Sequence, residues 1–355
     1  MRTNSMPHTA QRRFRLASCL LTFHLLLALA CTPAAQAAQA TASPIVERVG
    51  AVSIVVSDMD RSVDFYSQVL TFLKVSDVEV FGSEVEHLQG LFGVRMRIVR
   101  MRLGDEFIEL TEFLAPQGRP MPVDSRSNDR WFQHVAIIVA DMERAYRVLR
   151  EHNVKHASTG PQLLPAYIKS AAGIRAFYFR DPDSHFLEIL QFPPDKGDAK
   201  WHRPGEKLFL GIDHTAIVVG DTDASLRLYR DTLGMRVAGE SENYGTEQEH
   251  LNNVFGARLR ITALRAAQGP GIELLEYLAP RDGRPMPVSS HANDLWAWKT
   301  ILVTHEASPL TDVLRSGKHP LVSSGLVTLV DGRLGFRAGL LIRDPDGHLM
   351  QIVAE

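Results

Sequence analysis

The strongest constraint on the fold is a long internal repeat. The segment "EHLQGLFGVRMRI" from Glu86 returns as "EHLNNVFGARLRI" from Glu249, and "FRDPDSHFLEIL" from Phe179 returns as "IRDPDGHLMQIV" from Ile342. Both pairs are separated by 163 residues, and a repeat of that length indicates the duplication of a whole domain. A chain of 355 residues also exceeds what one ordinary core supports, so we expect two or more domains.

Each half of the repeat divides again into two similar modules. Four segments begin with an apolar, strand-like run that leads through an acidic turn into an amphipathic helix, and they start near Gly50, Phe132, Asp213 and Trp296. Acidic or hydroxyl residues stand where helix N-caps belong: Asp58 or Asp60, Asp141, Asp221 or Asp223, and Glu306 or Ser308. Short alternating stretches such as "RMRIVRMRL" follow as strands. The pattern predicts an α+β fold of four modules, each with one strand, one helix and then about three strands.

The expected domain boundaries follow from this repeat. The first domain spans residues 46–192 and the second spans residues 207–355, with two modules in each. Residues 193–206, rich in proline, glycine and charge, form the predicted linker. A repeated "GRPMPV" phrase, at Gly118 and Gly283, ends the first module of each half. Its prolines predict an extended connection to the next module, and a binding loop is the alternative interpretation.

Residues 1–40 have the pattern of a secretory signal peptide. Three arginines at positions 12, 13 and 15 precede the apolar run "LASCLLTFHLLLALA", and small residues then offer cleavage after Ala37 or Ala40. A membrane anchor is the alternative interpretation. Cys31 also allows a lipoprotein processing route. We therefore predict an exported protein, periplasmic or secreted, whose mature chain has no cysteine for disulfides unless Cys31 is retained.

The composition limits the kinds of partner that the protein can bind. A formal net charge of -2 provides no basic face for a phosphate backbone, so we expect no nucleic-acid partner. No later stretch has the length and hydrophobicity of a membrane span, so we expect none in the mature form. The expected partner is a small-molecule substrate or ligand, and the oligomeric state is left open.

Three features together resemble the vicinal oxygen chelate superfamily: the four modules, a histidine in a first strand, and the glutamate that ends "DPDSHFLE". This superfamily includes glyoxalase I, bleomycin and fosfomycin resistance proteins and extradiol dioxygenases. The resemblance runs from about Val46 to Glu355, and its most specific feature is the "RDPDxH" turn at Arg180 and Arg343. It implies βαβββ modules whose mixed sheets pair into cup-shaped half-barrels. It also implies that each module can give a metal ion one ligand from its first strand and one from its last.

The family positions can be carried over module by module. The four pairs are Ala51 and Glu109, His134 and Glu188, His214 and Glu273, and Lys299 and Gln351. The resemblance therefore implies metal ligands at His134, Glu188, His214, Glu273 and Glu109, whereas alanine and lysine cannot serve. The residues support this interpretation, because a carboxylate between apolar neighbours is costly unless a cation or a donor compensates it. A satisfied core histidine and a solvent-facing glutamate are the plainer alternatives.

Two arrangements of the modules remain open. If cups form within each half, the first cup has Glu109, His134 and Glu188. If modules two and three pair, one cup has His134, Glu188, His214 and Glu273, and the other cup keeps Glu109 alone. We predict the second arrangement, with a divalent metal ion such as Zn²⁺, Ni²⁺, Mn²⁺ or iron in that cup. Glu188 and Glu273 are the candidate catalytic residues because either could move a proton beside the ion.

Three functions fit these expectations. The first is a metal-dependent lyase or isomerase, similar to glyoxalase I, acting on a small oxygen-rich molecule. The alternative is a non-catalytic small-molecule binding protein of the resistance type. An extradiol dioxygenase ranks lower, because it needs two histidines and a carboxylate at one iron. Each half taken alone lacks one histidine, at Ala51 and at Lys299.

Overall fold

The computed structural model describes residues 45–317, 319–330 and 332–355. The expected signal peptide, residues 1–40, lies outside these residues. Module one contains β1 (Arg48–Val56), α1 (Met59–Gln68), β2 (Leu73–Phe81), α2 (Ser83–Gln89), β3 (Arg95–Leu103) and β4 (Glu106–Ala115). Module two contains β5 (Gln133–Val139), α3 (Met142–Glu151), β6 (Lys155–His156), β7 (Gln162–Leu163), β8 (Arg175–Arg180) and β9 (Phe186–Gln191).

The second half repeats this order after a short 3₁₀ helix, η1 (Ala199–His202). Module three contains β10 (Phe209–Val219), α4 (Thr222–Leu226), the π-helical turn η2 (Arg227–Thr232), β11 (Arg236–Tyr244), α5 (Thr246–Asn252), β12 (Arg258–Arg265) and β13 (Gly271–Ala279). Module four contains β14 (Lys299–Thr304), α6 (Ala307–Ser316), β15 (Val327–Thr328), the 3₁₀ turn η3 (Gly332–Leu334), β16 (Ala338–Arg343) and β17 (Leu349–Ala354).

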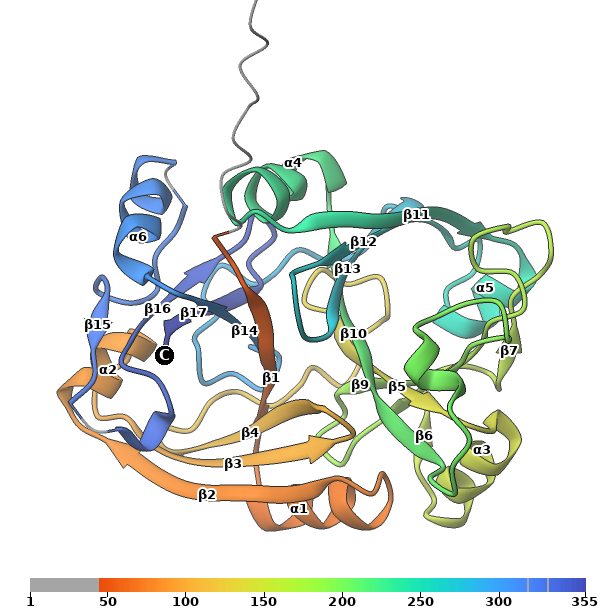
Figure 1. Ribbon diagram of the computed structural model, residues 1–355, viewed down its shortest axis with the longest axis horizontal. Helices are drawn as coiled ribbons and strands as arrows, with labels where there is room; N and C mark the ends of the chain where they lie inside the picture. Colours follow the sequence, from red (N-terminus) through yellow and green to blue (C-terminus); the bar gives the residue numbers. More distant parts are fainter. Residues whose placement is uncertain (1–44, 318, 331) are drawn as a thin grey trace, which may run out of the picture. The chain divides into compact units, whose positions relative to one another are not determined.

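The strands form two mixed sheets, and each sheet combines modules from both halves (Figure 1). Sheet A has the order β15-β16-β17-β14-β1-β4-β3-β2, and sheet B has the order β11-β12-β13-β10-β5-β9-β8-β6 with β7 beside β8. In each sheet the first strands of two modules meet at the centre as an antiparallel pair, and each is flanked by the parallel last strand of its own module. Module one therefore pairs with module four, and module two pairs with module three.

The helices begin largely where the sequence predicts. The side chains of Asp58, Asp141 and Asp221 each accept a hydrogen bond from the backbone N–H three residues later, at 2.9–3.0 Å, which satisfies an otherwise free donor. Glu306 precedes α6 and makes no such bond in the described structure. The short helices α2 and α5, between the second and third strands of their modules, were not predicted.

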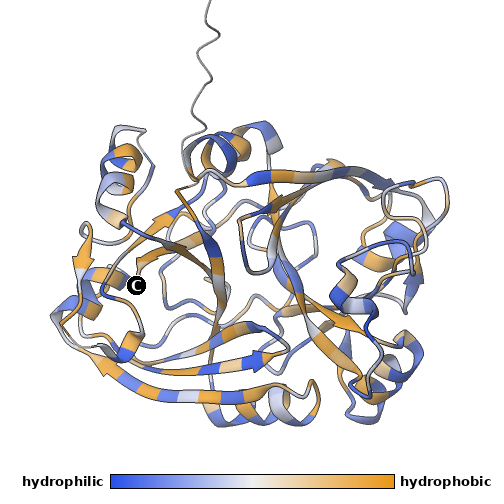
Figure 2. Cartoon of the chain, viewed as in Figure 1, coloured by the Kyte–Doolittle hydropathy of each residue, from blue (hydrophilic) through white to orange (hydrophobic). Residues whose placement is uncertain are grey.

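The two largest apolar cores lie on the helix-bearing faces of the sheets. One joins modules one and two, with Tyr66 from α1 packed in the same cluster as Phe177 from β8. The other joins modules three and four, with Tyr229 and Leu310 in one cluster. Helices α1 and α3 lie at one side of the sheets, and α4 and α6 lie at the other (Figure 1). The outer strands β2 and β11 are mostly exposed; apolar and polar residues are interspersed along β2, and polar residues follow one another in the second half of β11 (Figure 2).

The repeated "GRPMPV" phrases form a reciprocal clasp between the halves. Arg119 binds both carboxylate oxygens of Asp294, at 2.9 and 2.6 Å, and Arg284 binds Asp129 in the same way, at 3.0 and 2.7 Å. A Cβ atom at Gly118 would lie 1.8 Å from the carbonyl oxygen of Asn293, and the second copy is equally tight. The chain needs glycine there because the two connections touch. The phrase is thus a connection, as predicted, and each copy also binds the segment that follows the other copy.

The "RDPDxH" turns also have a structural role. His185 contacts the carboxylate of Asp181 at 2.8 Å and the carbonyl oxygen of Leu295 at 2.8 Å, and His348 contacts the carbonyl oxygen of Val218 at 2.9 Å. The first turn therefore ties module two to the other half of the chain, and the second ties module four to module three within its own half. None of the helices in the described part of the chain combines the length and apolar composition that a bilayer crossing requires.

Candidate metal centre

Strand register brings four of the predicted ligands onto one face of sheet B. Ala136 on β5 pairs with His214 on β10 and with Glu188 on β9. Ala216 on β10 pairs with His134 on β5 and with Glu273 on β13. Residues opposite one another in neighbouring strands point to the same face. The result is two parallel rows, each with a glutamate, an alanine and a histidine.

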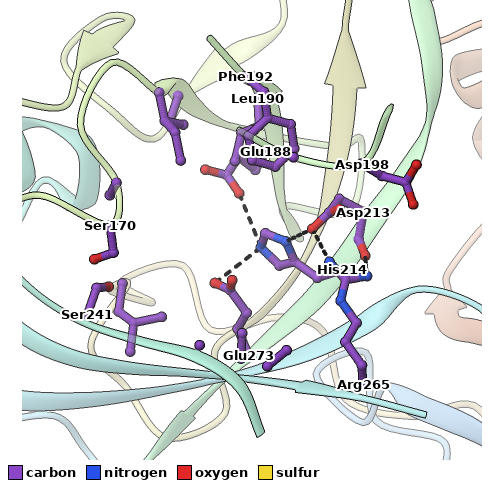
Figure 3. A pocket seen from close by; sticks show the side chains of 18 of the residues that line it. Ser170, Glu188, Leu190, Phe192, Asp198, Asp213, His214, Ser241, Arg265 and Glu273 are labelled. Atoms are coloured by element: carbon purple, nitrogen blue, oxygen red, sulfur yellow. Dashed lines mark hydrogen bonds and ion pairs between the residues drawn. The ribbon is translucent and has the colours of Figure 1, made fainter. Parts of the chain in front are cut away.

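The polar atoms of these rows converge. Nε2 of His134 lies 3.1 Å from Oε2 of Glu188, and Nε2 of His214 lies 3.7 Å from the same oxygen. His134, Glu188 and His214 can each offer a ligand atom within 4.8 Å of the other two. Oε2 of Glu273 is 3.4 Å from Nε2 of His214 (Figure 3). All four side chains come from modules two and three.

His134 is a buried imidazole without a hydrogen bond. Neither of its ring nitrogens makes a hydrogen bond to the described residues, although the side chain is 2% exposed and Nε2 lies 3.1 Å from Glu188. An orphaned buried nitrogen carries a desolvation cost. A cation between His134 and the nearby carboxylates would satisfy Nε2, and an imidazole with two carboxylates is a common donor set for such ions. The residues present therefore fit a divalent metal ion.

His214 is surrounded by carboxylates. Burial alone would lower its pKa, but Glu273, Asp213 and Glu188 outweigh burial and raise the pKa to about 9. Burial likewise opposes the ionised form of Asp213, yet His214 and Arg265 hold the pKa of that carboxyl well below its usual range. The site thus stabilises positive charge, which is the electrostatic property that a cation site needs.

The four ligands line a cavity of about 740 Å³ on the open face of sheet B. Apolar side chains such as Leu164, Ile174 and Phe192 form part of its wall, and polar groups such as Ser241 and Gln248 form another part. The segment predicted only as a linker contributes Lys200 and Trp201 to the wall. Sequence analysis missed this contribution because proline, glycine and charge indicate a connection and carry no pattern for a wall.

The corresponding positions of sheet A hold a different set. Ser53 pairs with Glu109 and Lys299, and Ile301 pairs with Ala51 and Gln351. These are the same two rows, but alanine and lysine replace the histidines. Ala51 and Ile301 belong to an apolar cluster with Leu88, Val303, Val327, Phe336 and Val353, against which Phe107, Leu329 and Leu334 pack.

Glu109 lies in sheet A, and the structure does not place it with the other four predicted ligands. Arg100 donates a hydrogen bond to it at 2.9 Å. Burial raises the pKa of Glu109, against the opposing influence of Arg100 and Lys299. Lys299 donates to Oε1 of Gln89 at 3.2 Å, and burial lowers its pKa to about 8. The positive charge in this cup therefore comes from side chains.

Comparisons with known proteins agree with the fold. The family model described as "Glyoxalase/Bleomycin resistance protein/Dioxygenase superfamily" matches residues 48–189 and 211–352, so the chain belongs to this superfamily. Glyoxalase I from Zea mays is similar in structure, with a TM-score of 0.56 and 15% identity over 86% of this chain and 92% of that chain. A proposed dioxygenase from Bacillus subtilis subsp. subtilis strain 168 has a TM-score of 0.54 and 15% identity over 88% of this chain and 86% of that chain.

These two likenesses establish a common fold and nothing finer. No curated protein sequence matches the chain significantly. The family resemblance predicted from the sequence is confirmed, as is the α+β fold of duplicated modules. A divalent metal ion is typical of this superfamily, and the His134, Glu188 and His214 group is where this chain could hold one.

Proposed function

We propose that the protein is a divalent-metal-dependent lyase or isomerase that acts on a small oxygen-rich molecule in the cup of sheet B. The observation that carries the proposal is the convergence of two histidines and two glutamates, from both halves of the chain, at the base of a cavity of about 740 Å³. A cavity of this size suits a small organic molecule. A divalent ion held there would supply Lewis-acid polarisation of a substrate oxygen.

The two glutamates suit different tasks. The Glu188 side chain is 5% exposed and lies beside both histidines, so it acts as a ligand. The Glu273 side chain is 24% exposed and contacts only one of them, so it is more open to the cavity. A carboxylate that reaches the substrate can accept and return a proton. We assign the proton transfer to Glu273, with Glu188 holding the ion.

Turnover of a panel of candidate substrates tests this division. The panel contains thiol adducts of 2-oxoaldehydes and other compounds with neighbouring oxygens, incubated without oxygen. We expect Glu273→Gln to retain the metal and to lower kcat by about 100-fold, the usual share of one general base. Glu276→Gln is the matched control, because Glu276 lies on the same strand and accepts a hydrogen bond from the N–H of Thr222. Equal turnover by wild type and Glu273→Gln would contradict the assignment.

A second function gains support from the pairing of the modules. Extradiol dioxygenase chemistry needs two histidines and one carboxylate at iron, and the sequence argument ranked it lower because each half lacks one histidine. Pairing modules two and three removes that objection, since His134, His214 and Glu188 lie together. Oxygen consumption with catechols by the Fe²⁺-loaded protein would favour this function over the first.

The resistance-type alternative predicts binding without chemistry. A ligand that binds stoichiometrically in the cup and is recovered unchanged from the metal-loaded protein would favour it. The lyase or isomerase proposal predicts a product of the same atomic composition, or fragments that together restore it.

We further propose that the protein is exported. The support is the basic and apolar pattern of residues 1–40 and the small residues at its end. The mature chain is expected to begin at Ala38 or Thr41, or at Cys31 if the lipoprotein route is used. Intact mass and N-terminal sequencing of the fractionated protein test this. A mature chain that retains Met1 would contradict export.

A further inference from the structure

We propose that Asp213 is a positioning residue of the candidate metal centre, which fixes the ring of His214 so that Nε2 faces Glu188. This inference rests on the metal-dependent function proposed above and goes beyond it, because Asp213 is neither a predicted ligand nor a proton carrier. Oδ2 of Asp213 lies 3.0 Å from Nδ1 of His214 (Figure 3).

A β-bulge makes this contact possible. Consecutive residues of a regular strand point to opposite faces, so a residue at position 213 should point away from the ring of His214. The register of β10 against β5 shifts between Ile212 and His214, which places the bulge at Asp213. Bulges re-aim side chains and are frequent beside functional sites. The bulge turns the carboxylate toward the imidazole.

Sheet A has a bulge at the corresponding position, but the bulged residue there has no side chain. The register of β1 against β14 shifts between Val49 and Ala51, so the bulged residue there is Gly50. Modules one and three therefore share this bulge in their first strands, and of the two only module three has a carboxylate at the bulged position. In module two, Gln133 precedes His134 and donates to Thr215 at 2.9 Å, with no contact to the histidine ring.

Two further donors hold the Asp213 carboxylate in place. Trp201 donates from Nε1 to Oδ1 at 3.3 Å, and Arg265 donates to Oδ2 at 2.8 Å. Arg265 also donates to the backbone carbonyl of Asp213 at 2.8 Å. With these donors the carboxylate acts as an acceptor, so Nδ1 of His214 keeps its proton and Nε2 is the nitrogen that gives up its proton when a cation binds. That tautomer is the one a metal ligand at Nε2 requires.

Trp201 links the segment between the halves to the site. Its ring packs with Ile138 and Leu190, and its N–H reaches Asp213. His134 has no such support at Nδ1 among the described residues: its ring packs against Tyr178 at 4.9 Å and Phe132 at 5.5 Å between centroids, and only its Nε2 lies near a carboxylate, that of Glu188. The two histidines therefore differ. His214 is oriented by a hydrogen-bond chain that begins in the linker.

The test compares Co²⁺ binding to the full mature chain and to its variants, by calorimetry and by the visible absorption of bound Co²⁺. We expect Asp213→Asn to weaken Co²⁺ binding by about 10- to 100-fold, the usual effect of losing such a partner, and to change the absorption bands. Trp201→Phe keeps an aromatic ring, though a smaller one, and removes the Nε1 donor to Asp213, so we expect a change of the same kind and smaller size.

Asp181→Asn is the matched control, because Asp181 is another buried carboxylate bonded to a histidine, His185, in a structural turn. We expect it to lower thermal stability and to leave Co²⁺ affinity unchanged. Wild-type affinity and spectrum in Asp213→Asn would overturn the inference and leave the proposed function standing. If Asp213→Asn does not fold, wild-type Co²⁺ affinity and spectrum in Trp201→Phe would overturn the inference. A wild-type chain that binds no Co²⁺ would overturn both proposals.

Discussion

In sheet B, Ala136 lies between Glu188 and His214, whereas at the same place in sheet A, Ile301 lies between Gln351 and Ala51. The two cups share strand order, register and a bulge in a first strand. They differ in a few side chains on two rows. Small residues leave space beside the ligands of sheet B, and a branched side chain occupies that space in sheet A.

The charges differ in the same way. The cup of sheet B gathers carboxylates around histidines, which a cation would balance. The cup of sheet A contains Lys299 and Arg100 beside a single carboxylate, Glu109, so its own side chains supply the positive charge. The comparison teaches that topology provides two equivalent positions for a site, and that residues on two short rows decide whether either one is used.

The largest expected effect comes from giving sheet B the side chain of sheet A. Ala136→Ile places a branched side chain between Glu188 and His214, so we expect metal binding to be lost while the fold is kept. Metal content after dialysis, with circular dichroism as the check on folding, measures this. Ala216→Ser, which copies Ser53 of sheet A, is the control and should retain the ion. Full metal content in Ala136→Ile would contradict the role given to the small residue.

The two arginines of the clasp, Arg119 and Arg284, should contribute similarly to stability. Arg119→Met and Arg284→Met each leave a buried aspartate without its guanidinium, so we expect each to lower the free energy of unfolding by about 3 kcal/mol. Each aspartate keeps two backbone donors, which places the loss at the low end for buried pairs. Arg126→Met breaks an exposed pair with Asp282 at 2.8 Å and only a long contact, at 3.7 Å, with Asp129, so it should cost about 1 kcal/mol. Denaturant unfolding measures all three, and equal losses at Arg126 and Arg284 would contradict the account.

Lys299 should make the stability of wild type depend on pH in a definite direction. Its folded pKa of about 8 lies below the ordinary lysine pKa of 10.5, so between these values the unfolded chain binds more protons. Stability attributable to Lys299 therefore rises with pH across that window, by about 3 kcal/mol in total. Lys299→Met should lack this rise when both proteins are unfolded by denaturant, metal-loaded, from pH 7 to pH 10.5. If the free energy of unfolding changed with pH equally in the two proteins, the lowered pKa of the buried Lys299 would be contradicted.

Much of this architecture was predictable because the chain repeats itself. The 163-residue offset gave the duplication, and aspartates at positions 58, 141 and 221 marked three helix starts. The ligand pairs came from the family resemblance, which could be applied because each pair lies on the first and last strand of its module. The pairing of modules two and three was also predicted, from the number of usable ligands in each arrangement.

Other features depend on contacts that a linear pattern does not contain. Asp213 was missed because alternation places it on the face opposite His214, and the bulge that reverses this is set by strand pairing. Trp201 was missed because it lies in a segment with the composition of a linker. The helices α2 and α5 are only seven residues long, too short for periodicity to mark them.

The central claim is that each chain has one working metal site, built by modules two and three. The most direct test is the metal stoichiometry of the purified mature protein, measured for wild type, His214→Ala and Glu109→Ala. The account predicts one ion per chain in wild type and in Glu109→Ala, and loss of the ion in His214→Ala. Metal that survives His214→Ala and disappears with Glu109→Ala would place the site within the first half of the chain and contradict the account.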